Sequence, residues 1–174
     1  MRYASIIIVL VCSIFSCNQL VKGRNGVTYK SAIQYNDFIV SRQTKLMQNV
    51  RNFAKAAEIN LDSAEKMLLI YAGETSNMIE EIKGMPPYKG DSILREAAVR
   101  SLSFYQKVFQ TDYARIIHLH KKGDKITNED DAEMKDIDSR IKKEEEGLQK
   151  SLQNAQKFFS DKNNMKLIEN KMQK

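Results

Sequence analysis

Residues 62–82 read DSAEKMLLIYAGETSNMIEEI, and this segment decides the fold. Side chains that suit a protein core recur there in alternating steps of four and three residues, at Ala64, Leu68, Tyr71, Thr75, Met78 and Ile82. This spacing places them on one face of a helix, as in a heptad seam. Asp62-Ser63-Ala64-Glu65 has the form of a capping box at its start, and Pro86-Pro87 ends it, because proline lacks the N–H donor. We therefore expect a long amphipathic helix whose apolar face needs partners.

Three other segments show helical periodicity. The first helix is expected from an N-cap at Thr28 to about Ile59, the third from Asp91 or Ser92 to Gly123, and the fourth from Thr127 to about Phe159. No run of alternating β-branched residues predicts a strand. Because the connections are short, neighbouring helices should be antiparallel. The prediction is an all-α fold, an up-down-up-down four-helix bundle with a short C-terminal helical extension that includes Met165, Leu167 and Ile168. A three-helix core with a detached fourth helix is the alternative.

The composition agrees with long helices and one domain. The chain has 174 residues, 29% of them charged, with only seven glycines and two prolines. Its formal net charge is +6, but the basic residues are spread along the chain. Nucleic-acid binding is therefore not expected, since it needs a basic patch or a known fold. The charge is interpreted mainly as a solvated surface, with attraction to anionic lipid or lipopolysaccharide as the alternative.

The N-terminus resembles a lipoprotein signal peptide. Arg2 is followed by an apolar run from Ile6 to Phe15, about ten residues, which is the size of a signal-peptide core and too short to span a bilayer. Ile14-Phe15-Ser16-Cys17 resembles a bacterial lipobox, in which a small residue precedes the cysteine that receives the lipid. We expect a signal peptide over residues 1–16, a polar tether over 17–27 from a lipidated Cys17, and a helical domain over 28–174. The alternative is an ordinary cleaved leader.

The residues around the cut also bear on redox state and location. The chain has two cysteines, Cys12 and Cys17. Cys12 would be removed with the leader, so the mature domain should contain no disulfide and depend on its core. Asn18 after the lipidated cysteine resembles the outer-membrane class of lipoproteins. Residues 18–26 contain no acidic surface-export signal, so we expect an outer-membrane lipid anchor that faces the periplasm.

The first helix carries a further resemblance. Tyr35-Asn36-Asp37, Ile39-Val40 and Gln43, shortly after a lipobox, resemble a family of uncharacterised bacterial surface lipoproteins of Bacteroidetes-like and spirochaete lineages. The resemblance covers about the first 60 residues. It implies a four-helix lipoprotein and no activity that could be assigned to a residue.

Two amides in this stretch are the candidate binding residues. Asn36 and Gln43 are seven residues apart, so they share a helix edge. They should lie near the level of Thr75 and Ser101, where a polar layer would set the register of the helices. The alternative is a small-ligand pocket lined by Tyr35, Asn36 and Gln43.

No set of side chains predicts catalysis or a metal site. The two histidines, His118 and His120, are two residues apart on different helix faces, and neither follows a glutamate as a di-iron bundle requires. Asp112 and Glu144 fall near apolar stripes. They are interpreted as edge residues that pair with Arg115, Lys142 or solvent, and only as a remote alternative as an acid/base pair of a hydrolase. We expect no enzyme, cofactor or metal.

These observations favour a non-enzymatic envelope protein. The first hypothesis is a lipoprotein of unknown biochemical role, anchored to the membrane through Cys17, whose helical bundle binds an envelope protein as a binding or adaptor module. The second is a periplasmic or secreted small-ligand carrier that uses the polar pocket between helices.

Overall fold

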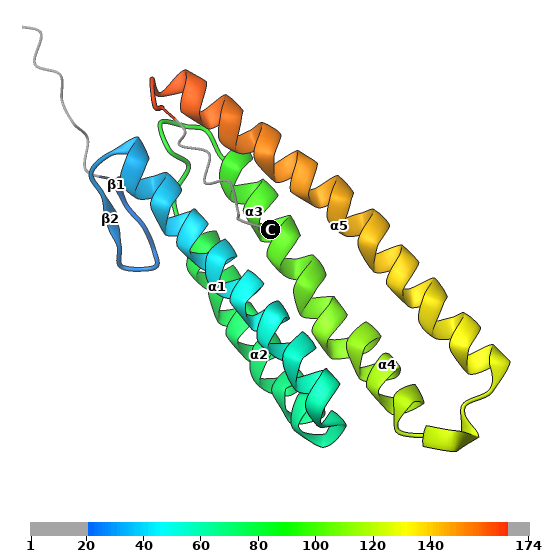
Figure 1. Ribbon diagram of the computed structural model, residues 1–174. Coiled ribbons are helices and arrows are strands. Elements are labelled where there is room, and N and C mark those ends of the chain that lie inside the picture. Colours follow the sequence, from blue (N-terminus) through cyan, green and yellow to red (C-terminus); the bar gives the residue numbers. More distant parts are fainter. Residues whose placement is uncertain (1–20, 167–174) are drawn as a thin grey trace, which may run out of the picture.

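A computed structural model describes residues 21–166, and the predicted leader, Cys17, Leu167 and Ile168 lie outside them. The predicted all-α class is confirmed: four helical rods dominate the described chain (Figure 1). The rods are α1 (Ala32–Ile59), α2 (Leu61–Lys83), α3 (Ile93–Lys107) continued by the π-helical turn η1 (Val108–Asp112) and α4 (Tyr113–His120), and α5 (Asn128–Lys162), with the 3-10 turn η2 (Gly123–Lys125) before α5. None of the described helices has the length and apolar character needed to cross a bilayer.

The rods do not pack evenly around one axis. α2 packs on both α1 and α3, whereas α5 packs chiefly on α3 and lies at the edge of the bundle (Figure 1). α5 reaches α1 close to its own C-terminal end, where Phe159 stacks on Tyr35 with ring centroids 5.5 Å apart. One side of α5 therefore lacks a neighbouring helix among the described residues.

A small β-hairpin precedes the helices. β1 (Val21–Lys22) pairs antiparallel with β2 (Thr28–Tyr29), and the Asn25 side chain donates to the Tyr29 hydroxyl and to the Glu81 carbonyl. The described part of the expected tether is thus folded against the bundle. The hairpin was not predicted, because two-residue strands are too short to show an alternating pattern. Because Thr28 belongs to β2, it is not the N-cap that was predicted. α1 begins after Ser31, whose hydroxyl accepts from Gln34 N–H.

The other helix boundaries follow the sequence signals with one correction. Asn60, and not the predicted Asp62–Glu65 box, caps α2, since its side chain accepts from Ser63 N–H at 2.8 Å. α2 ends at Lys83, before the prolines, as predicted. The capping box at the start of α5 is present, formed by Thr127 and Asp130.

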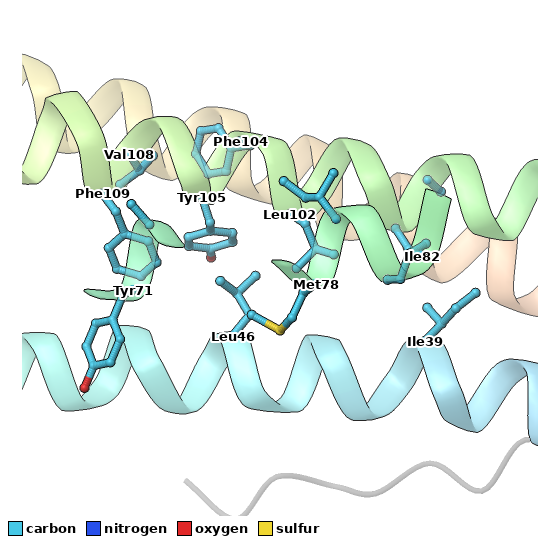
Figure 2. Close-up of a cluster of buried hydrophobic side chains, with 14 of the residues drawn as sticks. Ile39, Leu46, Tyr71, Met78, Ile82, Leu102, Phe104, Tyr105, Val108 and Phe109 are labelled. Atoms are coloured by element: carbon cyan, nitrogen blue, oxygen red, sulfur yellow. The ribbon is translucent and has the colours of Figure 1, made fainter. Parts of the chain in front are cut away.

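The core forms where α1, α2 and α3 face one another. Figure 2 shows Leu46 of α1, Met78 of α2 and Leu102 of α3 converging there. All six positions of the stripe predicted in α2 are buried. Burial of large apolar side chains such as Leu68, Met78 and Ile82 stabilises the fold by about 1.5–3 kcal/mol each, so this stripe accounts for the packing of α2 on both α1 and α3.

The π-helical turn shifts the register of the third rod. Tyr113 N–H bonds to Val108 O, five residues back, which inserts one extra residue into the turn. Phe109 and Tyr113 can then both contact Phe53, at centroid distances of 6.4 and 4.6 Å. Beyond the turn Ile117 and Leu119 are buried, and Ile116 is only partly buried. Ile117 therefore takes the buried position in this part of α4 in place of Ile116.

Candidate functional site

The three candidate binding residues of α1 are engaged in contacts between elements. Tyr35 is buried and its hydroxyl donates to the Pro86 carbonyl at 3.0 Å. Asn36 accepts at Oδ1 from Gln156 Nε2 of α5, also at 3.0 Å. Burial raises the pKa of Tyr35 well above its ordinary value, which keeps the hydroxyl protonated as a donor.

Gln43 connects α1 to α3. Its Nε2 donates to the Ala98 carbonyl and its Oε1 accepts from the Ser101 hydroxyl, both at 3.4 Å. Thr75, expected at the same level, instead donates to the carbonyl of Tyr71 in its own helix. The three candidate residues therefore hold α1 to three different elements, which favours the register layer over the pocket.

Asn49 is a buried polar residue that the sequence reading missed. It is fully buried between α1 and α2 and donates from Nδ2 to Glu74 Oε2 at 2.8 Å. Glu74 also pairs with Lys45. The spacing could have identified it, because Asn49 lies three residues after Leu46 and four before Phe53, the same helical step as the core positions.

The candidate carboxylates lie on the seam with α5 and have basic partners or solvent around them. Asp112, turned toward α5 by the π-helical turn, pairs with Arg140 at 2.7 Å and not with the predicted Arg115 or Lys142. Glu144 is exposed. Its neighbour Glu145 accepts instead from the buried Tyr105 hydroxyl.

Two tyrosines on this seam are strongly biased toward their neutral form. Burial, together with the bond to Glu145, raises the pKa of Tyr105 well above its ordinary value. Burial and the charge of Glu145 raise the pKa of Tyr113 to about 12. At neutral pH both are hydrogen-bonding or packing groups and not proton carriers.

The two histidines are surface residues, as predicted. His118 and His120 are both exposed on α4. Within residues 21–166 there is no group of three or more His, Cys, Asp or Glu side chains able to hold a metal ion.

The first surface hollow, here called the α2–α3 groove, has a volume of about 470 Å³. Its lining is mostly apolar and includes two amides, Gln106 and Gln110, and a single charged residue, Glu65. Leu69 stands at its edge with 82% of its surface exposed. Lining residues include Leu68, Ala72, Gly73, Gln106, Phe109 and Gln110.

Gly73 keeps this groove open. It lies inside α2, where glycine costs roughly 1 kcal/mol relative to alanine. A Cβ built on Gly73 would meet no atom within 4 Å, so no packing of the described chain requires a glycine there. The same is true of Gly147 in the middle of α5.

Gly147 lines the second hollow, here called the α3–α5 groove, of about 550 Å³. Ile93 and Phe158 lie at this groove, each with 47% of its surface exposed, and Arg100 and Lys150 also line it. Each of these two interior glycines therefore lines a groove, one whose single charged residue is Glu65 and one that is basic.

Comparison with known proteins adds no assignment: no protein-family model, curated protein or solved structure matches this chain.

Proposed function

We propose that this protein is a non-enzymatic lipoprotein of the bacterial envelope that holds a partner protein in its α2–α3 groove. The lipobox-like Ile14-Phe15-Ser16-Cys17 supports the anchor. The single observation that carries the binding role is Gly73, a helix-destabilising residue whose missing side chain leaves the groove open without serving any packing in the described chain.

The groove chemistry suits a neutral amphipathic helix of the partner. Leu68, Ala72 and Phe109 offer apolar contact, while Gln106 and Gln110 can hydrogen-bond at the edge. Helices bind such grooves through apolar side chains repeated every three or four residues. Glycine lets the backbone of an incoming helix come close, and exposed Leu69 extends the apolar contact area.

Substitution at Gly73 separates binding from folding. Gly73→Ala should raise the free energy of unfolding by roughly 0.5–1 kcal/mol, because alanine favours the helix.

Gly73→Leu should fold equally well, since the space at this position is open, but its side chain would fill the groove. We expect Gly73→Leu to abolish partner capture. The measurement is crosslinking in living cells through a photoreactive residue placed at position 69.

Gly147→Leu is the matched control, because Gly147 is also an interior helix glycine with open space around it. It should leave the crosslink at position 69 intact. The proposal fails if Gly73→Leu and Gly147→Leu give the same crosslinked species in the same yield. If the captured species is a second copy of this chain, the groove serves self-association instead.

A further inference from the structure

We propose that the outward faces of α3 and α5 form a surface that rests on anionic lipid of the membrane to which Cys17 is anchored. This surface, the basic flank, consists of Arg100, Lys107, Lys143, Lys150 and Lys157 with Ile93 and Phe158. The inference uses the anchor from the proposed function and is independent of the α2–α3 groove.

The cations of the basic flank are aligned by their spacing. Lys143, Lys150 and Lys157 follow one another at seven-residue intervals on α5, as do Ile93, Arg100 and Lys107 on α3. Residues seven apart lie on one helix face. The resulting row of positive charge extends along both helices, and all five cations are exposed.

Two other basic residues of α5 are held in ion pairs, unlike the five cations of the flank. Arg140 pairs with Asp112 and Lys162 with Asp91, at 2.7 and 2.8 Å. Within residues 21–166, no carboxylate lies within ion-pair distance of any of the five.

Acidic residues near the flank reduce its charge without cancelling it. Glu96 of α3 is engaged by Arg95 and by the Ser92 hydroxyl. Asp136, Glu144, Glu146 and Asp161 are exposed on α5, fewer than the five cations of the flank. The balance stays positive, so the surface complements an anionic one.

The flank also carries an apolar component in the α3–α5 groove. Ile93 and Phe158 are half-exposed and line the same hollow as Arg100 and Lys150. A surface that combines Lys or Arg with exposed Ile and Phe matches the membrane interface, where apolar groups enter the headgroup–acyl boundary and cations contact anionic headgroups.

The position of the apolar component favours lipid over an acidic protein as the occupant. Ile93 is the first residue of α3, and Phe158 lies near the end of α5, which Lys162 fastens to Asp91. The hairpin leads directly into the first turn of α1, which contains Tyr35. Tyr35 contacts both Pro86, shortly before α3, and Phe159, near the end of α5. The start of α3 and the end of α5 therefore lie at the end of the bundle that carries the hairpin (Figure 1). Cys17 precedes Val21 by four residues, a span of at most about 14 Å. An anchored chain would therefore hold this end of the flank beside the bilayer.

The test uses the chain from residue 18 onward, without leader or lipid, because every core residue of the described chain lies between Tyr29 and Phe159. The probe is vesicles of phosphatidylglycerol mixed with phosphatidylcholine, compared with pure phosphatidylcholine, in a flotation assay. We expect binding to the anionic vesicles only, weakened by salt. Replacing Lys143, Lys150 and Lys157 with Gln should lower the affinity about a hundredfold, at about fivefold for each cation.

A second triple variant controls for net charge. Lys55, Lys66 and Lys125 are exposed and lie outside the basic flank, and Lys→Gln at these three positions removes the same charge. This variant should keep most of the affinity. Equal losses in both triples, or no binding to anionic vesicles, would overturn the proposal. If the chain binds polyglutamate but not vesicles, and the first triple variant loses this binding, the flank would be a site for an acidic protein. This result would also overturn the proposal. A failed crosslink at position 69 with intact vesicle binding would refute the partner groove alone.

Discussion

Above pH 10 the folded state should lose stability steeply, by up to about 4 kcal/mol per pH unit. Burial raises the pKa values of Tyr35 and Tyr105 well above the ordinary value, and that of Tyr113 to about 12. Between pH 10 and these raised values, the unfolded chain releases the protons and the folded chain retains them, so rising pH favours unfolding. Each such tyrosine contributes about 1.4 kcal/mol per pH unit. Below pH 10 the contribution to stability is fully present.

The measurement is the free energy of unfolding in urea at several pH values, with tyrosinate absorbance and helical circular dichroism recorded together. The part of the tyrosinate signal that comes from Tyr35, Tyr105 and Tyr113 should appear together with the loss of the helical signal, because ionisation of these three requires unfolding. Tyr113→Phe should reduce the slope by about a third. The account is contradicted if Tyr35, Tyr105 and Tyr113 ionise near pH 10 while the helices persist.

Phe109→Ala should lower the free energy of unfolding by about 3–5 kcal/mol, a large share of the stability of a domain this size. Phe109 is fully buried, and its ring centroid lies 5.8 Å from that of Tyr71 (Figure 2). The centroid of the Tyr113 ring is 5.9 Å away. The truncation leaves a cavity beside the π-helical turn, where α1, α2 and the third rod meet. Urea denaturation of the variant measures the loss.

Phe158→Ala is the matched control, since it removes the same ring from a half-exposed position. It should cost less than about 1 kcal/mol. Similar losses for both variants would mean that Phe109 does not anchor the core.

The four helical segments could be predicted from the sequence, because each shows apolar residues at helical spacing. The stripe from Ala64 to Ile82 is buried at every predicted position, and Thr127 caps α5 as expected. Both features are local, since a helix face and a cap each depend on residues within a turn or two.

What the sequence did not predict depends on contacts between distant segments. The hairpin at Val21–Tyr29 is held by Asn25 bonding to Glu81, 56 residues away. The π-helical turn that brings Asp112 to Arg140 breaks the helical period on which the prediction relied. The candidate amides show the same limit: the edge shared by Asn36 and Gln43 was visible, but their partners, Gln156 and Ser101, were known only once the helices were placed.

The grooves could have been suspected from two glycines. Gly73 and Gly147 interrupt otherwise strong helical patterns, a departure that usually has a packing or functional reason. The structure argues against a packing reason, because a Cβ built at either glycine would meet no atom within 4 Å. This distinction could not be made from the sequence.

The anchor at Cys17 is the premise that joins the partner groove and the basic flank. Its direct test is metabolic labelling with a clickable fatty acid in a didermal bacterial host, comparing the wild-type chain with Cys17→Ser. The account predicts label on the wild-type protein alone, and recovery of that protein with the membranes. No label on either protein, with the chain recovered as a soluble secreted product, would contradict it.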